Sequence, residues 1–360
     1  MRGRKERQAE MLLGVTPDQL VPAKHPIRAI RALVDGVLAE LSPQFEAMYR
    51  PIGRPSVPPE HLLKASILMA LYSLRSERQF CERLQYDILF KWFMDLNIAE
   101  PAFDATTFSK NRQRLLDHDI ARAFFGEVVR EAQRRRLLSE DHFSVDGTLL
   151  QAWASIKSYR PRDEQPPAGG GRNREVDFHG ERRSRATHVS RTDGEALLFK
   201  KAASEAARLS YMGHALIENR HGLVVDVQLT QATGGAERDA ALEMLDRIKG
   251  RKGGITLGAD KGYDTYAFHD QLAARDVVAH IAWNGGAKRR PIPEALEGDP
   301  AYQTSLRRRK LVEEVFGWIK TVGAGRKLRY VGLRRNELWA TLTAAVYNLV
   351  RMAKLERLAA

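Results

Sequence analysis

The spacing of apolar residues predicts that the first 140 residues of the chain are helical. Over residues 25–48 apolar side chains recur every three or four positions, as on one face of a helix. Prolines between residues 51 and 59 must end this helix, because proline lacks the backbone N–H that a helix interior needs. A second helix is expected from Glu60, and Ser76 to Gln79 fits a capping box that opens a third. Further helices are predicted over residues 103–116 and 121–138.

The pattern changes at Asp141, after which strands and helices are mixed. Residues 142–146 alternate between polar and apolar, which is typical of a half-buried strand. Three successive strands followed by alternating helices and strands are the order of a ribonuclease H-like fold. The strands are expected at 142–146, 214–218, 223–230, 255–260 and 277–283, and the helices at 237–249, 266–275, 305–320 and 336–358.

The expected fold class is therefore α+β, in two domains. Residues 1–140 are expected to form the all-helical domain, and residues 141–360 a ribonuclease H-like domain built on a mixed sheet. Residues 157–212 follow the first strand and are rich in proline, glycine, arginine and serine over much of their length. This composition predicts a long, basic and partly flexible insertion in the second domain.

The chain carries a large excess of positive charge. Lys and Arg number 58 against 45 Asp and Glu, which gives a formal net charge of +13. So basic a protein often binds a polyanion, because each neutralised phosphate releases counterions; the alternative is a soluble enzyme that is merely basic. The single cysteine, Cys81, excludes an internal disulfide and a cysteine-based zinc site. The longest uncharged apolar run, 338–350, is too short to cross a bilayer, and no signal peptide is expected. These features predict a cytoplasmic, nucleoid-associated protein with no membrane partner.

Three carboxylates fall where a metal-dependent reaction on phosphodiesters would need them. Asp146 lies on the first predicted strand, Asp260 ends the fourth, and Glu313 lies on the late helix. Magnesium prefers hard oxygen ligands of this kind, and strand ends hold them rigidly. Each residue also has a purely structural interpretation, because such aspartates often cap turns and such glutamates often face solvent. On one continuous helix, Arg309 and Lys320 would lie within roughly 40° of Glu313, at about 100° per residue.

Basic residues gather around the third carboxylate and near the starts of the predicted N-terminal helices. A run of charge is usually a solvated face, but a run beside a proposed metal site favours contacts with phosphates. The residues predicted to bind DNA in the second domain are Arg307, Arg308, Arg309, Lys310, Lys320, Arg326, Lys327 and Arg329. Those predicted in the helical domain are Arg75, Arg78, Lys110 and Arg112.

At these residues the chain resembles the insertion-sequence transposases of the IS4 and IS5 group, and most closely the IS5 family. The group signature is a tyrosine, an arginine, a glutamate and a lysine; Arg309, Glu313 and Lys320 match it, and Leu306 stands where the tyrosine is expected. The segment 188–195 also departs from the family pattern. The resembling stretches are 144–148, 152–155, 259–264 and 312–320, and 53–60, 72–78 and 107–112 in the helical domain.

The resemblance implies a DDE transposase, a metal-dependent enzyme that cuts and joins DNA strands. It implies that Asp146, Asp260 and Glu313 are catalytic and hold two magnesium ions, for which manganese can substitute. It also implies that the helical domain recognises the terminal inverted repeats, that the enzyme binds target DNA, and that it forms a homo-oligomer on DNA.

Two alternatives stay open at this point. A protein derived from a transposase could bind DNA without cutting it, although three intact carboxylates argue against this. A ribonuclease H-like nuclease could hydrolyse without joining, although that leaves the helical domain without a role.

Overall fold

The computed structural model describes residues 14–48, 56–162, 184–200, 206–248, 254–283, 296 and 298–359. Short helices occupy the N-terminal part, as the apolar spacing predicted. In the part of the chain that is described, no helix is long and apolar enough to span a membrane. The N-terminal helices are α1 (Pro17–Leu20), α2 (Ile27–Glu40), α3 (Ser42–Ala47), α4 (Pro59–Leu71), α5 (Glu77–Tyr86), α6 (Ile88–Phe93), α7 (Thr106–Asp117) and α8 (Ile120–Arg134).

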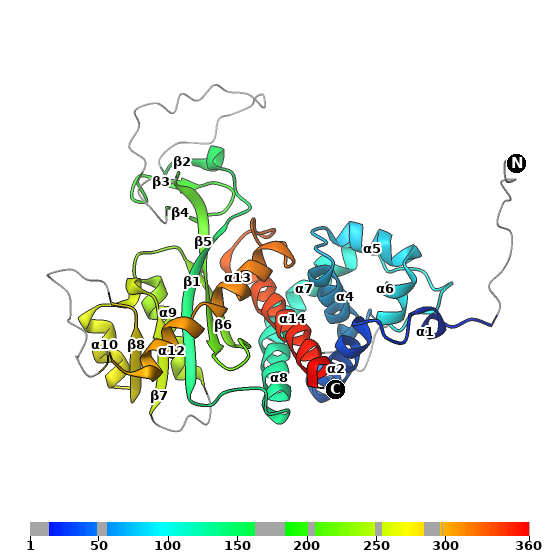
Figure 1. Cartoon of the computed structure of the whole chain (residues 1–360). Coiled ribbons are helices and arrows are strands. Elements are labelled where there is room, and N and C mark those ends of the chain that lie inside the picture. Colours follow the sequence, from blue (N-terminus) through cyan, green and yellow to red (C-terminus); the bar gives the residue numbers. More distant parts are fainter. Residues whose placement is uncertain are drawn as a thin grey trace, which may run out of the picture.

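A six-stranded mixed sheet forms the second half of the molecule (Figure 1). Strand β1 (His142–Gln151) lies inside it, antiparallel to β5 (Arg208–Glu218) and parallel to β7 (Ile255–Ala259). β7 pairs in parallel with β8 (Val277–Ile281), while β4 (Leu197–Phe199) and β6 (Val224–Gln231) both pair with β5. The long strands and the helices between them follow one another along the chain in the predicted order, three strands and then alternating helices and strands.

Helices cover both faces of this sheet. α9 (Ala236–Arg247) and α10 (Tyr266–Ala273) contribute to one hydrophobic cluster with Phe143 and Val145 of β1. Neighbouring residues of a strand point to opposite faces, so the even-numbered residues of β1 face the other way. The remaining helices are α12 (Pro300–Arg308), α13 (Leu311–Thr321) and α14 (Leu333–Ala359), and both α12 and α13 contact β1.

Helix α14 joins the sheet to the N-terminal helices. It packs against α8, α2 and α4 on the helical side and against β6 and α13 on the other (Figure 1). Ala344, Ala345, Val346 and Leu349 are fully buried, and a single hydrophobic cluster includes these residues, the N-terminal helices and part of the sheet. The expected division at residues 140 and 141 is therefore not a division of the hydrophobic core.

Several element boundaries differ from the predicted ones. The helix expected over 25–48 is interrupted at Leu41, and the one expected over 305–320 is interrupted at Arg309 and Lys310. Both interruptions keep helical backbone angles, so the apolar spacing runs through them and the sequence gives little sign of the break. Strand β5 begins at Arg208 rather than His214, because its first residues pair with β4 and with the end of β1.

The predicted insertion contains ordered strands. β2 (Tyr159–Pro161) pairs with β3 (His188–Ser190), and β4 and the start of β5 also fall within 157–212. Residues 163–183 and 201–205 of the insertion lie outside the described residues, and its predicted flexibility stays a prediction.

The segment 188–195, which departs from the family pattern, attaches the insertion to α14. The carboxylate of Asp193, buried in the interior, accepts a hydrogen bond of 2.7 Å from the Tyr211 hydroxyl. The carboxylate of Glu195 accepts one of 2.8 Å from the backbone N–H of Leu333, the first residue of α14. Acceptors at a helix N-terminus satisfy N–H groups that have no partner within the helix.

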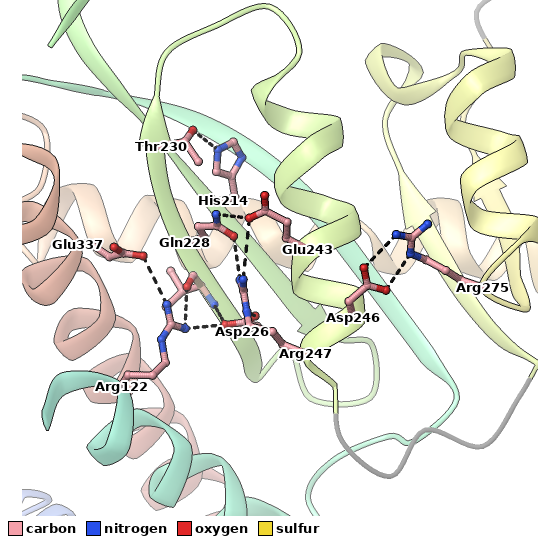
Figure 2. A network of polar contacts seen from close by, with 11 residues as sticks. Arg122, His214, Asp226, Gln228, Thr230, Glu243, Asp246, Arg247, Arg275 and Glu337 are labelled. Atoms are coloured by element: carbon pink, nitrogen blue, oxygen red, sulfur yellow. Dashed lines mark hydrogen bonds and ion pairs between the residues drawn. The ribbon is translucent and has the colours of Figure 1, made fainter. Parts of the chain in front are cut away.

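A polar network ties α8, α9 and α14 to strand β6 (Figure 2). Asp226, whose side chain is 9% exposed, lies 2.7 Å from Arg122 of α8 through one carboxylate oxygen and 2.7 Å from Arg247 of α9 through the other. Arg122 also reaches Glu337 of α14 at 3.5 Å. Because both oxygens of a nearly buried carboxylate are paired, we expect this contact to contribute more than a surface ion pair.

We predict that Asp226→Ala lowers the free energy of unfolding by about 1–3 kcal/mol, the usual effect of breaking such a buried polar network. The measurement is chemical denaturation followed by circular dichroism. Asp246→Ala is the matched control, because Asp246 forms its ion pair with Arg275 while half exposed, and its loss should cost under about 1 kcal/mol. Equal losses in the two variants would contradict the prediction.

Candidate active site

Strand pairing places the first two predicted carboxylates next to each other. In the parallel pair of β1 and β7, Ser144 lies opposite Gly258. Asp146 and Asp260 each lie two residues after this pair. Their side chains therefore lie side by side and point to the same face of the sheet. A Cβ atom on Gly258 would lie 2.8 Å from the Ser144 hydroxyl, so any other residue there would displace that hydroxyl.

Local hydrogen bonds orient both aspartates. The Asp260 carboxylate accepts a hydrogen bond of 2.8 Å from the backbone N–H of Gly262 and caps the short turn Lys261–Tyr263. One oxygen of Asp146 accepts a hydrogen bond of 2.8 Å from the N–H of Gly147. Asp260 therefore caps a turn through one carboxylate oxygen, as its structural interpretation suggested. The other oxygen of this carboxylate is available for a ligand.

Helix α13 brings the third carboxylate to the same place. Val312, Val315 and Phe316 are buried, and Glu313 is exposed at the edge of this apolar stripe. Its neighbour Glu314 turns toward α14, where its carboxylate lies 3.9 Å from Arg351.

The three carboxylates line one cavity of about 600 Å³. It brings together residues from β1, the end of β7, the end of β8, α13 and the break before α13. The lining residues are Asp146, Gly147, Thr148, Asp260, Lys261, Ala282, Trp283, Arg309, Glu313, Phe316, Gly317 and Lys320. The two cations of the predicted stripe, Arg309 and Lys320, therefore lie in the cavity although the helix is interrupted between them.

The cations suit a negatively charged ligand. Lys320 donates a hydrogen bond of 2.5 Å to the Thr148 hydroxyl, which holds its ammonium group beside the strand that carries Asp146. The Nε atom of Arg309 is buried and has no hydrogen-bond partner among the described residues. A buried guanidinium N–H without a partner is costly, so an anion such as a phosphate would satisfy it.

The carboxylates fit a hard divalent ion. All three donors are oxygens, and the described lining of the cavity contains neither a cysteine nor a histidine, the ligands that zinc prefers. Within the described ranges, no three His, Cys, Asp or Glu residues are arranged around a single point that one ion could occupy. Magnesium needs few protein ligands, because water and phosphate oxygens complete its octahedron, so pairs of carboxylates suffice.

The other predicted DNA-binding residues fall into two groups. Some are held by contacts within the protein: Arg112 pairs with Glu77 and stacks over Tyr330, and Arg329 donates to the carbonyl of Leu74. These contacts join the turn after α13 to the helical region, so Arg112 and Arg329 have a structural role here. The residues that stay exposed are Arg75, Arg78, Lys110, Arg307, Arg308, Lys310 and Arg326.

Two more of the predicted DNA-binding residues, Arg75 and Lys327, contact other parts of the protein, and two exposed tryptophans were not among the predicted site residues. Arg75 is exposed yet donates to the carbonyl of Lys327 at 2.6 Å, and Lys327 lies over the ring of Trp153. Trp153 is 51% exposed, and Trp283, which lines the cavity, is 49% exposed. The one sequence signal for Trp283 as a site residue is its position just after β8, at the same edge of the sheet as Asp260.

Family models match both halves of the chain. Residues 15–114 match the transposase domain DUF772, and residues 178–349 match the transposase DDE domain. The chain is a DDE transposase. It is thus an enzyme that cuts and joins DNA, as the resemblance implied, and enzymes with this domain depend on divalent metal ions. No curated protein matches the chain.

Distant likenesses to solved transposases also exist. The piggyBac transposase synaptic complex with hairpin DNA is 8% identical, with a TM-score of 0.41 over 95% of this chain and 78% of that one. The Mos1 strand transfer complex is 10% identical, with a TM-score of 0.21 over 77% and 82% of the two chains. At these scores the likenesses assign no role to any residue of this transposase.

We predict that Lys320→Ala weakens binding of the transposase to DNA and reduces the slope of log affinity against log salt by about 0.9, the value for one lost phosphate contact. Fluorescence anisotropy at several salt concentrations measures both quantities. Lys354→Ala removes an exposed lysine of α14 far along the chain from the cavity residues and is expected to leave the slope unchanged. An unchanged slope for Lys320→Ala would place this lysine outside the DNA path.

Proposed function

We propose that this transposase moves a bacterial insertion sequence of the IS5 family, and that its second half is a ribonuclease H-like catalytic domain spanning residues 141–360. The observation that carries the proposal is the cavity in which Asp146, Asp260 and Glu313 meet Arg309 and Lys320. Asp146 comes from β1, Asp260 follows β7, Arg309 lies in the break before α13, and Glu313 and Lys320 both lie on α13. The match to the group signature concerns the same arginine, glutamate and lysine.

In this proposal Asp146, Asp260 and Glu313 hold two magnesium ions, and manganese can replace them. The ions supply activation of an attacking hydroxyl and stabilisation of the leaving oxygen. Arg309 and Lys320 bind phosphate oxygens on either side of the carboxylates and fix the scissile bond in the cavity. Thr148 keeps the Lys320 ammonium in position through its hydrogen bond.

Glu313→Gln is expected to lower DNA cleavage about a thousandfold, since a neutral amide is a poor ligand and several kcal/mol of transition-state stabilisation would be lost. DNA binding should stay close to normal. Glu314→Gln is the matched control: its side chain is 59% exposed and lies toward Arg351, so cleavage should change by no more than a few-fold. Both variants are assayed on DNA that carries an element end.

Two results would contradict this assignment. Loss of cleavage in Glu314→Gln, with Glu313→Gln still active, would show that the wrong glutamate had been chosen. Full cleavage by the unaltered transposase in EDTA would exclude the two-ion mechanism altogether.

We further propose that the helical region, residues 1–140, recognises the terminal inverted repeats, and that the enzyme acts as a homo-oligomer on DNA. Arg78 at the start of α5 and Lys110 on α7 support this, because both are exposed and they remain once Arg75 and Arg112, which contact other parts of the protein, are set aside. Helices with exposed cations near their starts are a common means of reading the major groove.

A tethered probe tests this assignment in the full chain. The only cysteine, Cys81, is buried, and burial raises the pKa of its thiol to about 11, so it should react slowly with thiol reagents. An iron chelate attached to Arg78→Cys should therefore cut bound DNA selectively, and we expect the cuts within the terminal repeats. The same chelate on Lys354→Cys, in α14, should give none. Cuts confined to DNA outside the repeats would contradict the proposal.

A further inference from the structure

An exposed tryptophan lies where the chain leaves strand β1. Trp153 comes two residues after the strand and is 51% exposed, although the alanines on either side of it, Ala152 and Ala154, are buried. Ile156, three residues later, is 43% exposed. Tryptophan and isoleucine are among the side chains that folded proteins bury most completely, so two exposed ones within four residues need an explanation other than the core.

Contacts with two other segments hold this ring beside positive charge. The ammonium nitrogen of Lys327, in the turn after α13, lies 5.3 Å from the centre of the Trp153 ring, a cation–π distance. The turn is fixed to the end of β1, because Lys327 pairs with Gln151 as in a parallel sheet and the backbone N–H of Leu328 donates a hydrogen bond of 2.7 Å to the Gln151 carbonyl. The Arg75 guanidinium donates to the carbonyl of Lys327 at 2.6 Å, which joins the helical region to the same point.

The three segments that meet near Trp153 carry further cations. Arg326 lies in the turn after α13, Lys157 follows β1, and Arg78 lies in α5; all three are exposed. An aromatic ring among cations is the combination with which proteins bind unpaired nucleotides, because every base has a face that can stack and every nucleotide brings a phosphate. This surface therefore suits a DNA strand better than it suits an apolar protein partner.

The tryptophan also lies between the active site and the helical region. Asp146 and Gln151 are five residues apart on β1, which spans roughly 17 Å at about 3.3 Å per residue. Thr148, which holds the ammonium group of Lys320 in the cavity, lies between the two. Along one DNA strand the same span is about five nucleotides, at about 3.4 Å each. A strand that follows β1 from the cavity toward α5 therefore passes the Trp153 ring.

We propose that Trp153 is a stacking platform for one base of the DNA strand that leaves the active site, and that Lys327 binds a phosphate beside that base. This inference rests on the proposed function. Because a base within a duplex has both faces covered by its neighbours, the platform selects a base that is unpaired or displaced from the stack. Its role is to fix the register of the element end relative to the carboxylates.

Binding of the full chain to element-end DNA tests the platform, with fluorescence anisotropy measured at several salt concentrations. Trp153→Ala should weaken binding about tenfold, a common effect of losing one stacked base, and leave the slope of log affinity against log salt unchanged because the ring carries no charge. Trp153→Phe keeps an aromatic face and should recover most of the affinity. Tyr266→Ala is the matched control, because Tyr266 is 57% exposed but lies in α10, on the other face of the sheet from α13.

Abasic nucleotides, placed one at a time through the element end, identify the stacked base. We expect one position, about five to seven nucleotides from the scissile phosphate, at which loss of the base weakens binding by the unaltered chain about tenfold. The same abasic DNA should bind Trp153→Ala almost as well as intact DNA does, because the contact is already lost. A tryptophan with a purely structural role would give the same abasic profile in both proteins.

Three results would overturn the inference. If the unaltered chain neither prefers nor cleaves element-end DNA, the proposed function fails and the platform fails with it. If the chain binds and cleaves this DNA but the abasic profiles of the two proteins coincide, only the platform fails. If Trp153→Ala binds DNA normally but self-associates less in sedimentation experiments, the ring contacts a second copy of the chain instead. Circular dichroism verifies that each variant is folded.

Discussion

The burial of helix α14 is the constraint on which the rest of this transposase depends. Its 27 residues pack between the N-terminal helices and the sheet, and several of them are completely inaccessible. Helix α13, which carries Glu313, also packs against it; the rings of Trp318 and Tyr347 meet edge to face at 5.8 Å. The position of the third carboxylate relative to the sheet therefore depends on α14 as well as on the direct contacts of α13 with β1 and β5.

The two aspartates are positioned by a different and more local device. Parallel pairing of β1 and β7 sets their level, and the glycine opposite Ser144 allows the strands and helix α12 to approach closely. The sequence shows one aspartate on a predicted strand and one at the end of another, so these two candidates could be predicted, although β1 continues past Asp146 to Gln151 rather than ending there. Glu313 could be predicted as well, but from its match to the family signature rather than from the helix geometry, which is interrupted at Arg309.

The features that sequence reasoning missed all depend on contacts between distant segments. Nothing near Arg112 or Arg329 in the sequence shows that both meet at Tyr330. Net charge is also a poor guide to DNA-binding residues, because an arginine that joins two elements of the protein contributes the same charge as one that faces solvent.

The packing of α14 also bears on how transposases of this type can diversify. The N-terminal helices share their hydrophobic core with α14, near the other end of the sequence, so residues 1–140 alone do not contain a complete core. A chimera that exchanges them alone between relatives would join two surfaces that were never selected together. The N-terminal helices and α14 form one packed unit, and since α14 also packs against the helix that carries Glu313, substitutions at this shared interface are expected to alter the geometry of the proposed active site.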